Sequence, residues 1–297
     1  MFRRLLSFEE AQEVLRRSFS PRPVGVEQVP LPEAHDRVLA EEILAPMDVP
    51  PFHRSTVDGY ALKSADTFGA KENRPISLRF CGRVRVGETP KVTVQRGTAA
   101  ETATGAPLPR GADAVVMLEY VVRKDDIILV HRPVSKGENV MKAGSDISEG
   151  EAVLKEGLSL TPSKVGVLAA LGLTEVKVYR RPVVAIVSTG TEIVEPGKPL
   201  PPGKVYDINA HSLSAAVLEC GGEPVNLGIV PDEKGRLRGV LRRALNLADA
   251  VVTSGGVSVG PDDVIPEVLR ELGKPGVVIN GVALKPGKPT TIGVIEG

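Results

Sequence analysis

Helical and strand-like patterns follow one another along the chain. Apolar residues at helical spacing after the capping box Ser7–Glu10 predict a first helix, and the same spacing predicts a second helix from Glu33 to Ile43. Short apolar runs between turn residues then predict a small all-β module over about residues 49–141. Its expected strands are residues 76–80, 91–94, 114–118 and 127–131.

A shorter segment follows the β module. Thr161 is the predicted N-cap of a helix that begins at Pro162 and ends before Gly172. We expect this segment to pack against the N-terminal helices. The β module is then an insertion between two parts of one domain.

From Arg181 onward, buried strands are expected to alternate with helices. The expected strands are residues 182–188, 225–230, 250–253 and 290–295, and the expected helices are 209–221, 233–248 and 261–272. Asn209 is the predicted N-cap of the first of these helices. The alternation predicts a doubly wound, mostly parallel sheet, so the fold class is α/β plus β.

Composition and charge exclude several classes of protein. The chain has 297 residues, 42% of them hydrophobic, and its 37 basic side chains balance its 37 acidic ones. A neutral chain lacks the electrostatic footprint of a nonspecific nucleic-acid binder. Cys81 and Cys220 form neither a metal motif nor a disulfide framework, and we expect both to be small core residues. With no apolar run of about 18 residues, we expect a cytoplasmic protein that binds neither membranes nor nucleic acid.

The loops that follow the predicted strands carry the candidate chemistry, because ligands of open α/β sheets bind beyond the carboxyl ends of the strands. Ser188–Glu192 follows the first strand, Asp232 follows the second, and Ser254–Asp263 follows the third. The last of these is rich in glycine and leads into a helix, a combination that suits a phosphate or pyrophosphate. The simpler interpretation is a tight turn that needs glycine for packing.

Three acids and two lysines complete this candidate site. Glu192, Asp232 and Asp263 follow three different strands, and carboxylates that converge there favour a hydrated Mg²⁺ bound to substrate phosphate. Taken singly, each acid is more simply a helix cap or a solvated loop residue. Lys285 and Lys288, on a proline-stiffened loop, would offer positive charge to a phosphate or a tetrahedral metal oxyanion.

In the β module, residues 55–61 contain an Asp-Gly turn at Asp58 and residues 102–109 contain Thr104. Residues 144–147, just after the module, contain Asp146. A simple turn or cap explains each of them equally well. The four histidines have no metal-ligand spacing.

Together these motifs resemble the molybdopterin molybdenumtransferase family, the MoeA-type enzymes that include the gephyrin E domain. The resemblance covers essentially the whole chain. Its motifs occur in family order at residues 55–61, 104–109, 114–117, 144–147, 188–192, 205–207, 254–260 and 285–289.

The resemblance implies an elongated homodimer that takes adenylated molybdopterin, uses Mg²⁺, inserts molybdate or tungstate and releases AMP. The implied domains are an elongated dimerisation domain (1–47 and 143–178), the inserted β module (48–142) and the molybdopterin-binding α/β domain (179–297). The implied catalytic residues are Asp58, Thr104, Asp146, Glu192, Asp232, Asp263 and Lys285. The implied cofactor-binding residues are Ser188, Thr189, Gly190, Ser254, Gly255, Gly256, Ser258, Gly260 and Lys288. The implied metal ligands are Glu192, Asp232 and Asp263.

The resemblance also implies that Asp58, Thr104 and Asp146 face the α/β domain of the other subunit. This sequence departs from the family at Val57, where many members have Met, and at Gly281, where some have Lys. Family members also continue beyond the strand at residues 290–295, so we expect the C-terminal end of the family's α/β domain to be missing.

Two alternatives follow from this departure and from the shared α/β domain. One is a molybdopterin adenylyltransferase, which would consume ATP. The other is a non-catalytic molybdopterin-binding or scaffold dimer. A molybdopterin adenylyltransferase and molybdenum-dependent enzymes are the expected partners of the transferase.

Overall fold

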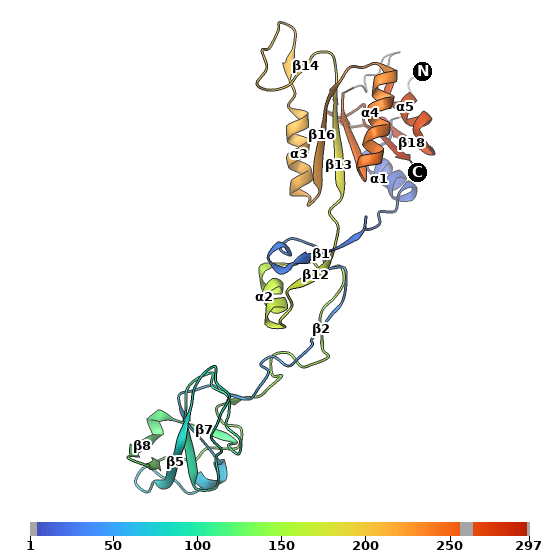
Figure 1. Cartoon of the computed structure of the whole chain (residues 1–297). Coiled ribbons are helices and arrows are strands. Elements are labelled where there is room, and N and C mark those ends of the chain that lie inside the picture. The colour runs from blue at the N-terminus through green and yellow to red at the C-terminus, as the bar shows by residue number, and fades with distance from the viewer. Residues whose placement is uncertain (1–4, 256–263, 296–297) are drawn as a thin grey trace. The chain divides into compact units, whose positions relative to one another are not determined.

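The structure is a computed structural model that describes residues 5–255 and 264–295 (Figure 1). Its contacts divide the chain into two units, residues 1–27 with 179–297, and residues 28–178. Within the described residues, no helix is both long and apolar enough to cross a membrane.

A three-stranded parallel sheet forms the centre of the first unit. Strand β13 (Val183–Thr189) lies between β16 (Glu223–Val230) and β17 (Ala250–Ser254), and it pairs in parallel with both. The apolar run of β13 is buried from Ala185 onward because it is the central strand and helices pack against the sheet. The predicted parallel strands at 182–188, 225–230 and 250–253 are therefore confirmed.

The strand order makes β13 the switch point of the sheet. The chain passes from β13 through helix α3 (Asn209–Glu219) to β16 on one side, then through α4 (Lys234–Leu247) to β17 on the other. Right-handed crossovers in opposite directions place α3 and α4 on opposite faces of the sheet. Ligands of such sheets bind where the strand order reverses, at the carboxyl ends of the strands.

Helices α4 and α5 (Val264–Leu272) share an apolar core. Leu237 and Leu241 of α4, one helical turn apart, pack with Ile265 and Val268 of α5, and each of these four side chains is at most 3% exposed. The predicted helices over 209–221 and 233–248 are confirmed. The helix predicted over 261–272 is confirmed from residue 264, because residues 261–263 lie outside the described residues.

The last predicted strand has a different partner from the one expected. Strand β19 (Thr291–Ile295) pairs antiparallel with β18 (Pro275–Asn280), which the sequence analysis did not predict, in a separate two-stranded sheet.

Helix α1 (Phe8–Ser18) covers this small sheet. The predicted capping box is present, since the Ser7 hydroxyl accepts the Glu10 amide at 3.1 Å and the Ser7 amide donates to the Glu10 carboxylate at 2.8 Å. Ala11 packs with Ile279 and Val282 in one buried cluster. The contacts therefore place residues 1–27 with the α/β unit, whereas the expected boundaries grouped residues 1–47 with 143–178.

The second unit has a core built from both sides of the β module. Leu39 and Ile43 pack with Leu160 and Leu168 in one cluster. Strand β2 (Ile43–Leu44) pairs with β11 (Ala152–Leu154), β1 (Val26–Pro30) pairs with β12 (Glu175–Tyr179), and α2 spans Pro162–Ala170. This shared core agrees with the expected insertion of the β module between the two segments.

The predicted helix from Glu33 to Ile43 is wrong. Residues Leu31–Glu33 form only a 3-10 turn (η1), and Asp36 has a φ of 58°, which no α-helix accommodates. Beyond it the backbone is extended, with isolated bridges from Val38 and Leu39 to the chain after the β module. The apolar residues that are spaced as in a helix lie instead on an extended segment. Pairing of this segment with residues after the β module outweighs the local helix propensity.

The β module is a six-stranded sheet in the order β7-β4-β6-β5-β9-β8, in agreement with the expected all-β module. The strands are β4 (Gly59–Leu62), β5 (Ile76–Val84), β6 (Thr98–Thr102), β7 (Ala114–Met117), β8 (Val121–Lys124) and β9 (Ile127–Val130), with 3-10 turns η2 (Ser64–Thr67) and η3 (Leu118–Tyr120). The strand predicted at residues 91–94 is reduced to one bridge between Thr93 and Arg110. At the start and end of the module, β3 (Arg54–Ser55) pairs with β10 (Val140–Met141).

Candidate functional site

The carboxyl edge of the parallel sheet brings several predicted site residues together. Ser188 of β13 is the register partner of Ser254, the last residue of β17, and Thr189 is the partner of Val230, the last residue of β16. Since β13 is the switch point, these residues stand where an open α/β sheet binds its ligand.

Two hydroxyl groups at this edge are buried without a partner. Ser188 and Thr189 are each 2% exposed, and among the described residues neither Oγ of Ser188 nor Oγ1 of Thr189 forms a hydrogen bond. A buried hydroxyl left unpaired costs about 1–3 kcal/mol. A ligand that accepts hydrogen bonds from these hydroxyls would remove this cost, so their position at a ligand-binding edge favours such a ligand.

The described glycines of the site are explained by close packing and by backbone conformation. A Cβ on Gly255, whose φ is 97°, would lie 2.2 Å from the carbonyl oxygen of Thr189. A Cβ on Gly190, whose φ is 143°, would lie 2.7 Å from a carboxylate oxygen of Glu192. Gly255 therefore lets two backbone segments approach one another, which is the packing interpretation of its turn. The flexible Glu192 side chain could move aside, so Gly190 is needed for its positive φ. Gly256, Ser258 and Gly260 of the phosphate-binding prediction lie outside the described residues.

The acids of the predicted metal site are only in part described. The Glu192 carboxylate lies against Gly190, whose amide donates to the Val230 carbonyl at 3.4 Å, so the loops after β13 and β16 begin side by side. Asp232 follows two residues after Val230 and is exposed, while Asp263 lies outside the described residues. Among the described residues, no three potential ligands cluster closely enough to hold a metal ion. Two exposed carboxylates on adjacent loops nevertheless fit Mg²⁺, which commonly takes one or two carboxylates together with water and substrate phosphate.

The pKa of one further acid shows how the loop after β13 is arranged. A hydrogen bond from Lys198 lowers the pKa of Glu195 below its usual value, and the positive charge of Lys198 acts in the same direction. Because Lys198 pairs with Glu195, Glu192 is the carboxylate of this loop for which the described residues provide no ion pair.

The lysine loop is an exposed turn. The carbonyl of Lys288 accepts the Val282 amide at 3.1 Å, and the carbonyl of Gly287 accepts the Thr290 amide at 3.1 Å. Lys285 and Lys288 are both exposed. The described hydrogen bonds do not connect this loop to the edge of the β13 sheet, so its approach to a common ligand remains a prediction.

Two residues near the edge were not among the predicted site residues. The side-chain amide of Asn209 donates to Ser254 Oγ at 2.6 Å. Asn209 is therefore not the N-cap that the sequence analysis predicted. The buried carboxylate of Asp207 caps α3 instead, by accepting the Ala210 amide at 3.0 Å. The signal in the sequence was the Asp-x-Asn spacing itself, which offers two competing caps.

In the β module, the structure joins two predicted site residues. Oδ1 of Asp58 accepts hydrogen bonds from the Thr104 amide at 2.8 Å and from the Thr104 hydroxyl at 3.1 Å. The adjoining Gly59 allows this loop to turn closely past β7, because a Cβ there would lie 2.0 Å from the Val116 carbonyl oxygen. The Asp58–Thr104 pair is thus a preformed acceptor site with Oδ2 left for another donor.

Asp146 has different neighbours. Its amide donates to the Val49 carbonyl at 3.0 Å and its side chain is exposed. The described hydrogen bonds do not link Asp146 with Asp58. The expected meeting of these residues with the α/β domain of another subunit remains a prediction.

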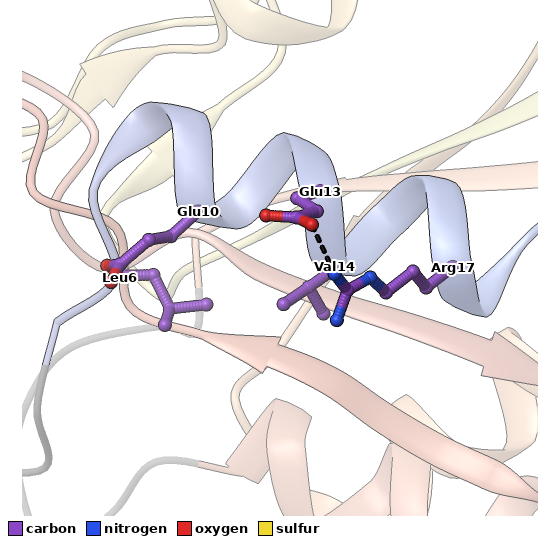
Figure 2. Close-up of a pocket in the computed structure, with 5 residues that line it drawn as sticks. All are labelled: Leu6, Glu10, Glu13, Val14 and Arg17. Carbon is purple, nitrogen blue, oxygen red and sulfur yellow. Dashed lines mark hydrogen bonds and ion pairs between the residues drawn. The ribbon is translucent and has the colours of Figure 1, made fainter.

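A shallow pocket of about 280 Å³ lies along helix α1, and none of the predicted site residues lines it (Figure 2). Leu6, Glu10, Glu13, Val14 and Arg17 line it. Its charged groups are already occupied, since Glu10 completes the capping box and Glu13 pairs with Arg17. We assign no function to this pocket.

Comparisons with known proteins cover both units. Residues 6–172 match the family described as "MoeA N-terminal region (domain I and II)", and residues 185–297 match the "Probable molybdopterin binding domain". A molybdopterin molybdenumtransferase of Nostoc sp. is 37% identical over 90% of this chain, and one of Mycobacterium tuberculosis is 35% identical over 98%. The chain spans 61% of the length of the Nostoc protein and 72% of the Mycobacterium protein.

The structural comparison agrees with these matches. A crystal structure of a molybdopterin biosynthesis MoeA protein from Pyrococcus horikoshii aligns with 99% of this chain and 73% of its own, at a TM-score of 0.87 and 44% identity. A second one from the same organism has a TM-score of 0.82 and 36% identity, over 98% of this chain and 72% of its own. These matches support the predicted α/β plus β fold class. From the two matching domains, the relatives and the shared fold, we conclude that the chain belongs to the MoeA family.

Proposed function

We propose that this chain acts in molybdenum cofactor biosynthesis as a molybdopterin molybdenumtransferase of the cytoplasm. It would insert molybdate or tungstate into adenylated molybdopterin and release AMP in an Mg²⁺-dependent reaction. The observation that carries the proposal is the pair of buried hydroxyls of Ser188 and Thr189 at the switch point of a MoeA-family sheet, which have no hydrogen-bond partner among the described residues. The names of the curated relatives support the same activity.

The described residues suggest how the substrate would be held. The hydroxyls of Ser188 and Ser254 would donate to phosphate oxygens of the adenylate, because an anion offers only acceptors. Glu192 and Asp232 would hold Mg²⁺, with Asp263 as the third expected ligand. When bound, the cation neutralises charge that develops on phosphate oxygens during cleavage of a phosphoanhydride. Lys285 and Lys288 would attract the incoming oxyanion.

The Asp58–Thr104 pair would act on the other side of the substrate. Oδ1 of Asp58 is saturated by two donors, which fixes the orientation of the carboxylate and leaves Oδ2 as its acceptor. We propose that this pair, with Asp146, reaches the substrate across the interface of a homodimer. Sedimentation equilibrium tests the dimer, and a monomer at micromolar concentration would contradict this part of the proposal.

The decisive experiment measures AMP release from purified adenylated molybdopterin, with Mg²⁺ and with or without molybdate or tungstate. We expect release that depends on the oxyanion and stops when EDTA removes the cation. ATP consumption with unadenylated molybdopterin would favour the adenylyltransferase instead. AMP release that does not depend on any oxyanion would contradict the transferase. Tight binding without release would favour the non-catalytic dimer.

A matched pair of variants on one loop tests the role of Glu192. We expect Glu192→Gln to lower the rate of AMP release at least tenfold and to raise the Mg²⁺ concentration needed for half-maximal rate. Glu195→Gln is the control, since its carboxylate is exposed and already paired with Lys198. Equal rates for both variants and the wild type would contradict the assignment of Glu192.

A further inference from the structure

The side-chain amide of Asn209 forms a hydrogen bond with a hydroxyl at the sheet edge. Its Nδ2 donates to Ser254 Oγ at 2.6 Å, so one lone pair of that oxygen is occupied by a donor. A serine hydroxyl has one proton and two acceptor sites. With Asn209 supplying a proton to the oxygen, the hydroxyl proton of Ser254 turns away from the amide and is available to an acceptor.

Asn209 can reach across to β17 because another residue performs the capping. The Asp207 carboxylate, 6% exposed, accepts the Ala210 amide at 3.0 Å at the start of α3. The Asn209 side chain is therefore not needed by the backbone of its own helix. Its amide spans instead from α3 to the last residue of a strand 45 positions later.

Ser188 lies beside Ser254, on the same face of the sheet. Ser188 and Ser254 are register partners on adjacent parallel strands, and side chains of paired residues point to the same face. The Ser188 hydroxyl is 2% exposed and has no hydrogen-bond partner among the described residues. Two hydroxyls thus stand side by side, the one oriented by an amide and the other buried and unsatisfied.

We propose that Asn209 is a positioning residue that makes Ser254 a hydrogen-bond donor to a phosphate group, with Ser188 as the second donor. The ligand class is an anionic phosphate ester or anhydride, because its oxygens accept from both hydroxyls without offering a competing proton. This inference rests on the proposed function for the identity of the ligand. The geometry of the Asn209–Ser254 contact stands independently of it.

A double-mutant cycle tests whether Asn209 acts through Ser254. The full chain and its variants Asn209→Ala, Ser254→Ala and the double variant are titrated calorimetrically with AMP and, separately, with inorganic pyrophosphate, each with Mg²⁺. We expect Asn209→Ala and Ser254→Ala each to weaken binding about tenfold, which corresponds to about 1.4 kcal/mol. The double variant should bind no more weakly than Ser254→Ala alone, because the two residues contribute one interaction.

The melting temperature separates positioning from a purely structural contact. Asn209→Ala should melt within a few degrees of the wild type, since Asp207 retains the helix cap. If that variant does not fold, the near-isosteric Asn209→Asp replaces it in both backgrounds. Its carboxylate accepts the Ser254 proton and should weaken binding more when Ser254 is present than in the Ser254→Ala background.

Several results would overturn the inference. These are additive losses in the cycle, unchanged affinity of Asn209→Ala, and a wild-type chain that binds neither probe. Coupling with AMP alone would identify the adenylate phosphate, and coupling with both probes would identify phosphate groups in general. Coupling in a chain that releases no AMP would contradict the proposed function and leave this inference intact.

Discussion

Asp249 joins three segments of the α/β unit, and its replacement offers a quantitative test of how this unit is held together. Nη2 of Arg180 donates to both carboxylate oxygens of Asp249, at 2.8 and 3.0 Å, and the Val183 amide donates to one of them at 2.8 Å. The same guanidinium nitrogen reaches the Val24 carbonyl at 3.3 Å. The perturbation is Asp249→Ala, which removes the acceptor for both donors.

The expected loss of stability is modest because the pair is partly solvated. The side chains of Arg180 and Asp249 are 36% and 26% exposed, so water screens the ion pair, and we assign it about 0.5–1 kcal/mol. The Val183 amide left without its acceptor adds about 1 kcal/mol. A total of about 1.5–2 kcal/mol corresponds to a drop of roughly 3–8 °C in the melting temperature of a unit of this size.

The pH dependence has a definite sign. Burial raises the pKa of Asp249, but hydrogen bonds from Arg180 and the Val183 amide outweigh it and bring the pKa below its ordinary value of 3.8. A carboxyl whose pKa is lowered by folding stabilises the protein above its unfolded pKa, and that contribution disappears as the pH falls through the folded pKa. The difference between wild type and Asp249→Ala should therefore be constant from neutral pH down to about 5 and shrink below about 4.

Differential scanning calorimetry over a series of pH values measures both effects. Asp249→Asn is the matched control, because it keeps the size of the side chain and one oxygen for the Val183 amide. We expect it to lose about half as much stability as Asp249→Ala. A melting temperature of Asp249→Ala within one degree of the wild type at pH 7, or a difference that does not change below pH 4, would refute the reasoning.

The remaining predictions concern the candidate sites. Thr104→Ser should keep most of the AMP-release rate, whereas Thr104→Val, which lacks the hydroxyl that donates to Asp58, should release AMP about tenfold more slowly. Equal rates would show that this side-chain contact does not contribute to the reaction. Gly255→Ala should destabilise the fold by more than 2 kcal/mol in denaturant titrations, because its Cβ would overlap the Thr189 carbonyl at a φ of 97°; a smaller loss would mean that the turn relaxes. Removing divalent cations with EDTA should abolish AMP release and leave the melting temperature unchanged, since the candidate carboxylates are exposed; a large drop would indicate a structural cation instead.

The sequence was sufficient for the parallel sheet because its strands are long apolar runs. The run ending in Thr189 is recognisable without any knowledge of its neighbours, as expected for a strand buried on both faces. By contrast, β4 (Gly59–Leu62) is only 4 residues long and β6 (Thr98–Thr102) contains only small or polar residues, and no periodicity marks them. They are strands because each lies between two others in the six-stranded sheet. Such pairing between distant segments is invisible to a local pattern.

Tertiary contacts also explain why the helix predicted at residues 33–43 is wrong. There the local spacing of apolar residues favoured a helix, but Leu39 and Ile43 are needed in a core shared with Leu160 and Leu168. An extended segment delivers side chains to that core and pairs with the returning chain, and the positive φ of Asp36 redirects the backbone into it. Tertiary contacts therefore decided both the missed strands and the false helix.

The candidate site shows where prediction from the sequence reaches its limit. The position of Ser188 and Ser254 at one sheet edge followed from strand alternation alone, and the register confirms it. The sequence did not show that Asp207 caps the helix while Asn209 contacts Ser254, because both residue types cap helices equally well. Only the structure shows that Asp207 is buried against the start of α3 while Asn209 faces Ser254. Strand patterns thus locate the edge where an open α/β sheet binds its ligands, and the hydrogen bonds of its short polar side chains determine which atoms remain available for a ligand.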